Sequence, residues 1–311
     1  MILSRQVLVA LSTFLVSTQL CSIWNLSLQN PRSHVCPILE ALQPNVWSPA
    51  KPRNEDRDSF PSSSEMCVLR HLGGDPNNND YGAWTICETA RLLESRASDR
   101  KAIIYSFGLG TDTGFDEEVI ERYGAVVHGF DPTPGSIKYV RTRGKRLPSC
   151  YFGFHPFGLN VHDGVIDLYP PENPNFISHT QIARPGVQPV AATLLSLSTI
   201  MQMLSHRKIH VLKMDIEGAE YAVLESLLNL PDSSLEEARR RAWSAHGDPS
   251  ARQLPFDQLC VEFHPKNHPR GEEAGARAIR SIVGAMEERG YPLVHETIAM
   301  EFSFSRYPLP S

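Results

Sequence analysis

The sequence predicts an α/β fold built on a doubly wound, mostly parallel sheet that closes with an antiparallel hairpin. From about residue 85, short runs rich in β-branched and aromatic residues alternate with longer segments of helical period. This alternation is typical of parallel strands joined by crossover helices. Near the end of the chain, two strand-like runs, Tyr291 to Glu296 and Ile298 to Tyr307, follow each other with almost no linker. Such close spacing predicts the closing hairpin.

Five strands are predicted for the sheet. Each is a short, largely apolar run of the kind that is buried in a parallel sheet. In chain order they are Ala102 to Phe107, Ala125 to Phe130, Tyr151 to Leu159, Ile209 to Met214 and Gln258 to Phe263. A further strand around Gly164 to Tyr169 is expected to form a hairpin with the third.

Helices are expected between these strands, where apolar residues recur three and four positions apart. They are predicted over Thr85 to Ser95, Phe115 to Tyr123, Ser136 to Arg143, Leu195 to Ser205, Glu217 to Leu228 and Glu272 to Arg289. Gly124 and Gly290 stand where a left-handed residue ends a helix. Pro170 to Pro189 holds five prolines and is predicted to be a loop lying over the site. Pro231 to Pro255 is a polar insertion.

The N-terminal part of the chain has a different composition. Residues 7–24 are mostly apolar and follow Arg5. These 18 residues are long for a signal-peptide core and barely long enough to span a bilayer. Residues 1–28 are therefore predicted to be a signal peptide or a signal anchor, with a buried helix of a cytosolic enzyme as the alternative. Residues 29–64 are predicted to be a flexible stem, and residues 65–311 the folded domain. This layout predicts a secretory-pathway protein: luminal in the ER or Golgi, single-pass membrane, or secreted.

Cysteine usage and charge narrow the function classes. None of the six cysteines forms a CxxC pair, so a zinc site is not expected. Cys67 and Cys87 flank a loop rich in Gly, Asn and Asp, which a disulfide could close in an oxidising compartment. Cys260 lies in an apolar run and is predicted to be a buried free thiol. The net charge of −5 argues against a nucleic-acid partner, which normally binds a basic surface.

Two strand ends suggest a ligand that contains adenosine. Gly108-Leu109-Gly110 follows the first strand directly, and glycine there allows the backbone to approach a ligand closely. Asp131 ends the second strand, 23 residues after Gly108, where a carboxylate can accept hydrogen bonds from a ribose diol. The full GxGxxG pattern is absent, which favours S-adenosylmethionine over a nicotinamide cofactor. A plain tight turn remains the alternative for the glycines.

Two further strand ends carry candidate catalytic groups. Asp215, Glu217 and Glu220 crowd the turn after the strand that ends at Met214, so they suit a general base or a cation site. Helix capping is the alternative reading. Glu262 and His264 share one face of the next strand, and His264 is a second candidate base. If a metal ion bound here, its ligands would be Asp215, Glu262 and His264, but we expect no metal.

Several segments of the chain resemble those of a known family. The segment VLKMDIEGAEYAVLESL is similar to the hallmark strand, turn and helix of FkbM-type methyltransferases, and QLCVEFH follows at a similar spacing. Upstream, IIYSFGLGTDTGFDEEVIERYGAVVHGFDPTP and the loop ending in GAWTIC resemble the branch of methyltransferase-like protein 24. The resemblance covers about residues 65 to 307.

This resemblance implies a Rossmann-like class I methyltransferase that uses S-adenosylmethionine. It implies that Ser106, Phe107, Gly108 and Gly110 surround the methionine part of the donor and that Asp131, with Pro132 beside it, holds the ribose. Asp215, His264 and Glu217 are the predicted catalytic residues. The expected reaction is O-methylation of a hydroxyl on a sugar or small molecule. Many methyltransferases have an acidic residue where Ser106-Phe107 precedes the glycine, so Asp112 or Asp116 is expected to contact the donor's amino group instead. A non-catalytic binding module with the same fold is the alternative.

Overall fold

A computed structural model describes residues 67–74, 82–143, 147–171, 173, 177–230 and 254–307. All of them belong to one compact unit, Asp58–Ser311. The predicted targeting segment 1–28 and stem 29–64 lie outside the described residues, as does nearly all of the polar insertion. Among the helices of the described ranges, none has the length and apolar character that crossing a membrane requires.

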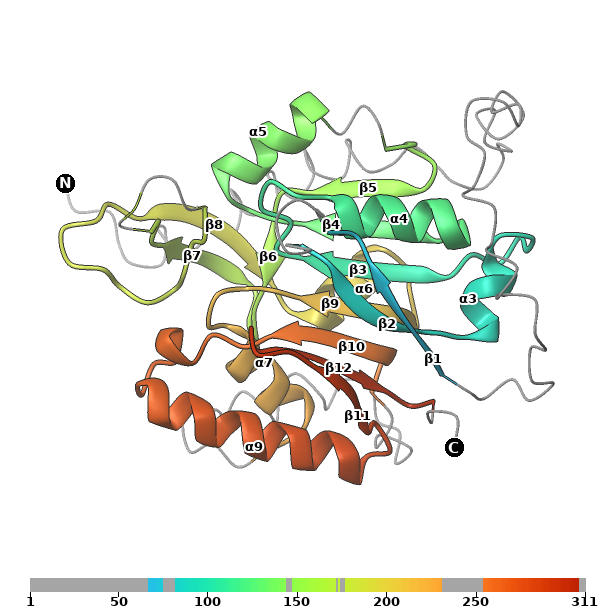
Figure 1. Cartoon of the computed structure of the whole chain (residues 1–311). Helices are drawn as coiled ribbons and strands as arrows, with labels where there is room; N and C mark the ends of the chain where they lie inside the picture. Colours follow the sequence, from blue (N-terminus) through green and yellow to red (C-terminus); the bar gives the residue numbers. More distant parts are fainter. Residues whose placement is uncertain are drawn as a thin grey trace. The chain divides into compact units, whose positions relative to one another are not determined.

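The centre of the fold is a seven-stranded sheet with the order β11-β12-β10-β9-β3-β4-β5 (Figure 1). Its strands are β3 (Ile103–Phe107), β4 (Val126–Phe130), β5 (Phe152–His155), β9 (Ile209–Met214), β10 (Phe256–Glu262), β11 (Leu293–Glu296) and β12 (Glu301–Ser305). From β5 to β10 neighbouring strands run parallel, whereas β12 pairs antiparallel with β10 and β11. The predicted doubly wound sheet with its closing hairpin is therefore confirmed.

The helices connect these strands where their apolar faces can be buried. They are α3 (Ala90–Ser95), α4 (Gly114–Tyr123), α5 (Pro134–Arg143), α6 (Leu197–Met203), α7 (Glu220–Leu227) and α9 (Glu272–Glu288). Gly124 ends α4 in the left-handed conformation, with φ of 57°, as predicted. On α9 the apolar residues Ile279, Ile282 and Met286, three and four positions apart, are buried, and this helix packs beside α7.

The predicted helix Thr85 to Ser95 is wrong in its first half. Residues Trp84–Glu88 form strand β2, which pairs antiparallel with β1 (Val68–Leu72), and the helix begins only after the N-cap Thr89. The β1–β2 hairpin contacts β10 and β12 of the main sheet. Its strand character depends on those distant partners, since Gln258 hydrogen-bonds both N and O of Cys87 at 2.8 Å.

The predicted Cys67–Cys87 disulfide is present and closes this hairpin, with 4.8 Å between the Cα atoms. Cys150 is disulfide-bonded as well. Cys260 is a buried free thiol, as predicted. Two cysteine predictions thus hold, although the sequence did not indicate that the disulfide lies on a strand pair.

The predicted third strand, Tyr151 to Leu159, is divided in two. Pro156, which cannot donate to a ladder hydrogen bond, follows β5, and the chain then enters a separate three-stranded sheet as β6 (Gly158–Leu159). The strand expected around Gly164 to Tyr169 exists as β7 (Gly164–Leu168), but it pairs with β8 (Val190–Leu195) instead of forming a hairpin with the third strand. We did not predict β8. Leu195 belongs to this strand, and Ser196 caps the helix that follows.

Candidate active site

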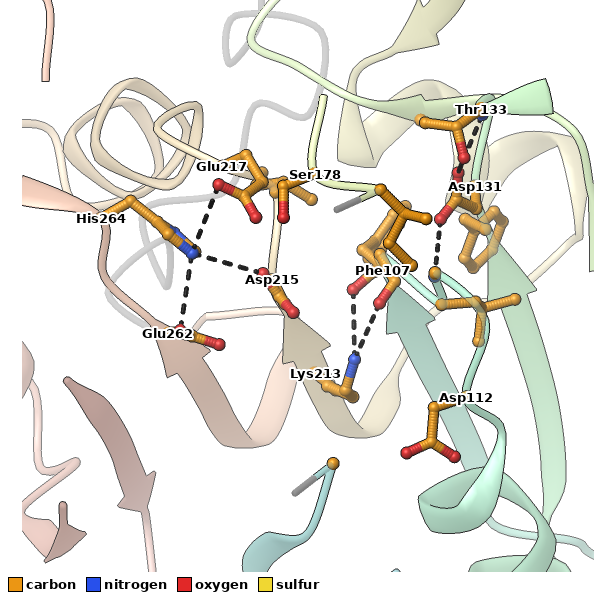
Figure 2. Close-up of a pocket in the computed structure, with 18 of the residues that line it drawn as sticks. Phe107, Asp112, Asp131, Thr133, Ser178, Lys213, Asp215, Glu217, Glu262 and His264 are labelled. Carbon is orange, nitrogen blue, oxygen red and sulfur yellow. Dashed lines mark hydrogen bonds and ion pairs between the residues drawn. The ribbon is translucent and has the colours of Figure 1, made fainter. Parts of the chain in front are cut away.

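A pocket of about 720 Å³ opens at the carboxyl ends of the parallel strands. It lies where the strand order reverses between β3 and β9, the place where open α/β sheets bind ligands. Residues from the ends of β3, β4, β9 and β10 line it, and Figure 2 shows several of them. The loop 177–181 contributes Ile177, Ser178, His179 and Gln181 to its wall, so the predicted Pro170 to Pro189 loop does lie over the pocket.

The glycine turn after β3 is required by close packing. Gly108 has φ of 75°, and a Cβ atom there would lie 1.7 Å from the backbone oxygen of Asp215. Glycine therefore allows the ends of β3 and β9 to meet. Phe107, Gly108 and Gly110 line the pocket. Ser106, which we expected beside the ligand, is fully buried and is not part of the pocket lining.

Asp131 fastens the glycine turn to the end of β4. Its Oδ2 accepts the N–H of Gly110 at 2.9 Å, and its Oδ1 accepts the N–H and hydroxyl of Thr133 at 2.8 and 2.6 Å. A carboxylate offers about four acceptor positions, so one position on Oδ2 is left for a ligand. Asp131 and Pro132 both line the pocket.

An apolar wall adjoins Asp131. A Cβ atom on Gly158 would lie 2.7 Å from Leu194 and 3.3 Å from Pro132, and one on Gly110 would lie 2.8 Å from Ile177. Leu159 and Leu168 line the same region of the pocket. An apolar surface beside a carboxylate suits a flat heterocycle attached to a diol.

The other side of the pocket is acidic and is built around His264. Its Nε2 lies 3.5 Å from Glu262, 3.6 Å from Glu217 and 3.7 Å from Asp215. Figure 2 shows the imidazole directed at these three carboxylates. Thus Asp215 and His264, which we placed on neighbouring strand ends, are brought together.

The turn after β9 differs from the prediction that α7 begins at Glu217. Glu217 has φ of 55° and Gly218 has φ of 106°, so the chain turns sharply and α7 begins at Glu220 with Ala219 as its N-cap. The capping alternative for Asp215 is therefore wrong. Despite the turn, Glu217 and Glu220 both face His264, since Glu220 accepts the backbone N–H of His264 at 2.8 Å.

The protonation states follow from this crowding. Burial alone would lower the pKa of His264, but the hydrogen bond from its ring to Glu220 and the charges of Glu220, Glu217 and Asp215 raise it to about 10. Burial raises the pKa of Asp215 to about 6. Burial and the neighbouring Asp215 also raise the pKa of Glu262. At neutral pH the cluster therefore contains an imidazolium and an ionised Asp215.

The same residues bear on the question of a metal. Donor atoms of Asp215, Glu262 and His264 lie within 4.8 Å of one another, so their spacing alone would admit a cation. Without a cation, the protonated His264 supplies the positive charge that these carboxylates face. That no metal binds to this cluster stays a prediction.

The pocket also contains residues that the sequence analysis did not single out, Lys213 and Trp84 among them. Lys213 is 6% exposed within β9, and its Nζ donates to the carbonyl oxygens of Gly108 at 3.1 Å and Phe107 at 3.5 Å. Trp84, from the disulfide-closed hairpin, places its ring centroid 4.7 Å from that Nζ. A lysine inside the run IHVLKM was the available signal, because charged residues are rarely buried without a partner.

The family follows from comparison with known proteins. A sequence model of the methyltransferase FkbM domain matches residues 110–293, which is more than half of the 311 residues. The chain belongs to the FkbM methyltransferase family. The match includes Asp131, Asp215 and His264, but it begins after Gly108 and leaves out the β1–β2 hairpin. The sheet of this FkbM-family protein has the class I methyltransferase arrangement that the sequence predicted.

Curated relatives support this assignment. The chain is 29% identical over 171 residues to the probable methyltransferase-like protein 24 of Homo sapiens, and 28% identical over 210 residues to that of Rattus norvegicus. The alignments cover 53% and 65% of this chain but 40% and 49% of the relatives. The chain therefore spans about half the length, or less, of these relatives.

Solved structures give weaker likenesses. The methyltransferase FkbM of Methylobacillus flagellatus KT has a TM-score of 0.37 at 13% identity, covering 66% of this chain and 43% of that one. Monomeric WbdD has a TM-score of 0.35 at 13% identity, covering 68% and 38%.

Proposed function

We propose that this FkbM-family protein transfers a methyl group from S-adenosylmethionine to a hydroxyl on a sugar or small molecule. The observation that carries the proposal is one pocket with two different sides. One side joins Asp131 to an apolar wall, and the other groups Asp215, Glu217 and Glu262 around His264. A donor site and a proton-accepting site thus share one cavity.

The residues present fit the proposed donor. Asp131 retains one acceptor position on Oδ2 for a ribose hydroxyl, and Pro132, Leu194 and Ile177 offer an apolar surface for adenine. When bound, the donor would supply an electrophilic methyl group on a sulfonium. The protein's own part is to align an acceptor oxygen with that methyl group and to exclude water.

Asp215 is the proposed general base. Burial raises its pKa to about 6, so Asp215 is ionised at neutral pH. Because this pKa lies near the working pH, Asp215 can serve as an efficient base. As the new O–C bond forms and the S–C bond breaks, the acceptor's hydroxyl proton passes to Asp215. His264 is protonated, and its imidazolium, with Nε2 3.7 Å from Asp215, attracts that carboxylate and faces the acceptor oxygen. Glu217 balances the charge of that imidazolium from 3.6 Å.

The charge of the acceptor side supports an uncharged acceptor. Asp215, Glu217, Glu262 and Glu301 all line the pocket, and His264 is the cation among them. Burial and the neighbouring Asp215 raise the pKa of Glu262 to about 8, so that carboxyl is neutral at neutral pH. A phosphate, sulfate or carboxylate placed beside Asp215 and Glu217 would be repelled by their like charges. A hydroxyl of a neutral sugar or small molecule meets no such penalty.

The compartment is also a proposal. A closed Cys67–Cys87 disulfide and a disulfide-bonded Cys150 support an oxidising compartment, which agrees with the predicted signal or anchor in residues 1–28. Sequencing the N-terminus of the mature protein tests whether that segment is removed.

The function is tested by titrating the purified protein with S-adenosylhomocysteine in a calorimeter and following its thermal unfolding. We expect saturable binding in the micromolar range and a raised unfolding temperature. Incubation with methyl-labelled donor and a panel of neutral and anionic glycans should then label neutral hydroxyl acceptors. If the protein shows neither heat of binding nor a shift in its unfolding temperature, the proposed function fails and a non-catalytic binding module with this fold is the better reading.

A further inference from the structure

The turn between β11 and β12 has an apolar, exposed tip, formed by Ile298-Ala299-Met300. All three side chains are exposed, Ile298 completely and Met300 to 41%. Hairpin turns are usually built from Gly, Asn, Asp and Ser, because these residues adopt turn conformations readily and are well solvated. The tip instead leaves apolar surface in water, at a place where a polar turn would serve the fold equally well.

The backbone holds this tip in one conformation. Met300 has φ of 67°, a left-handed value that bulky residues rarely adopt. Its N–H donates to the carbonyl oxygen of Thr297 at 3.1 Å, and the N–H of Thr297 donates to that of Glu301 at 2.9 Å. The carbonyl oxygen of Met300 accepts the N–H of Phe263 at 2.9 Å. The tip is therefore fastened to the residue that directly precedes His264.

The tip borders the acidic side of the pocket. Ile298 and Ala299 line the pocket, and so does Glu301, the first residue after the turn. Glu301 pairs across the sheet with Glu262, one of the acids around His264. The exposed apolar surface thus lies beside the place where the acceptor hydroxyl is proposed to react. Apolar surface that adjoins a ligand pocket commonly marks a binding contact.

We propose that Ile298 and Ala299 contact an apolar part of the acceptor, so that the methylated hydroxyl belongs to a neutral amphipathic molecule such as an alkyl glycoside. The proposal rests on the proposed function and deepens it. Covering an exposed isoleucine is favourable only when an apolar group takes the place of water. A neutral ligand with its hydroxyl at Asp215 and its apolar group at Ile298 matches both surfaces. Ile298 is then a specificity-determining residue on the acceptor side.

Neutral glucosides that differ only in their alkyl group test this contact. Methyl, butyl and hexyl β-D-glucosides are titrated into the disulfide-bonded protein saturated with S-adenosylhomocysteine, which occupies the donor site, and saturation-transfer NMR gives each Kd. In wild-type protein, affinity should rise roughly fourfold for each CH₂ group that the tip covers. Hexyl glucoside should therefore bind about tenfold or more tightly than methyl glucoside. In Ile298→Ser the three affinities should agree within about twofold, with S-adenosylhomocysteine binding unchanged.

The chain offers a matched control in Val165. This side chain is also aliphatic and 57% exposed, but it lies on β7 and does not line the pocket. Val165→Ser should therefore keep the wild-type dependence on alkyl length. Ile298 is completely exposed, so Ile298→Ser should unfold at the wild-type temperature and its effect on binding should not come from misfolding.

The outcomes separate the inference from the proposed function. If wild-type protein does not bind S-adenosylhomocysteine, the proposed function itself fails. If it binds S-adenosylhomocysteine but its affinity for the glucosides does not rise with alkyl length, or it binds none of them, the inference is overturned. A rise that persists in Ile298→Ser overturns it as well. Phosphatidylcholine vesicles test the competing contact: sedimentation of wild-type protein with them, lost in Ile298→Ser and without any dependence on alkyl length, would assign the tip to a lipid surface instead.

Discussion

The Nδ1 atom of His264 lies 3.3 Å from Oε1 of Glu220, a carboxylate that is completely buried. The same oxygen accepts the backbone N–H of His264, while Oε2 accepts the N–H of Gly218 at 2.7 Å. Glu220 therefore holds both the turn after β9 and the ring, and the ring presents Nε2 to the pocket. A residue at the start of α7 thus positions one at the end of β10.

Glu220→Gln should lower the pKa of His264. The hydrogen bond to Glu220 and its charge raise that pKa towards 10, so without the charge the imidazolium should lose its proton at a lower pH. NMR titration of the ring measures the change. Glu273→Gln, on an exposed ion pair of α9, is the control. An unchanged titration in Glu220→Gln would contradict the positioning role.

Asp215→Asn should slow methyl transfer by a factor of roughly a hundred or more, the usual contribution of a general base. Affinity for S-adenosylhomocysteine should change little. In wild-type protein the rate should rise as the pH increases through about 6, because Asp215 must be ionised and burial raises its pKa to that value. Asp167→Asn, on an exposed part of β7, should keep the wild-type profile. A rate that is independent of pH between 5 and 7 would exclude Asp215 as the base.

Asp131→Ala should abolish binding of S-adenosylhomocysteine, measured by calorimetry. It should also lower the free energy of unfolding by about 1–3 kcal/mol, because the N–H groups of Gly110 and Thr133 lose their acceptor. Asp163→Ala separates the two effects. Asp163 accepts from Ser196 and Thr199 at 2.7 Å but is not a pocket residue, so its loss should affect stability alone. If Asp131→Ala still binds S-adenosylhomocysteine, Asp131 does not hold the ribose.

Replacing both Cys67 and Cys87 with serine should destabilise the protein by about 3 kcal/mol, as the loop-closure estimate gives for a separation of 20 residues. Donor affinity should also fall, since the hairpin holds Trp84 over Lys213. Thermal unfolding and calorimetry measure the two effects. Cys260→Ser, at a free thiol, is the control. If affinity is unchanged in the double variant, the hairpin does not help to form the pocket.

Three histidines, one buried and two partly buried, should each make the protein less stable in mild acid. Burial lowers the pKa of His155 to about 4 and lowers those of His128 and His206. Below an unfolded-state pKa of about 6.5, the unfolded chain therefore binds more protons at these three histidines than the folded chain does. Each such histidine lowers stability by up to about 1.4 kcal/mol per pH unit between these values. Urea unfolding from pH 7 to 5 measures the slope, which His155→Gln should reduce. An unchanged slope in that variant would contradict this account.

The elements with strong local signals were predictable. Residues Ile209–Met214 form a strand with the predicted bounds, because an apolar run flanked by polar turns suits a buried parallel strand. The end of α4 at Gly124 and the hairpin of β11 and β12 also follow from local signals. The predictions failed where distant partners decide the conformation. Strand β2 depends on Gln258 and on the disulfide, and β8 on pairing with β7.

The sequence by itself determined which residues end the parallel strands, and hence that Gly108, Asp131, Asp215 and His264 meet at one edge of the sheet. Only the tertiary structure decided their detailed roles. It engages Glu220 with His264, so that the imidazole holds its proton, and it buries Lys213 under Trp84 next to the glycine turn. The reason is physical: local periodicity shows where each strand and helix lies along the chain and which side chains share a face. Protonation and pairing depend on burial and on charges brought together from distant parts of the chain.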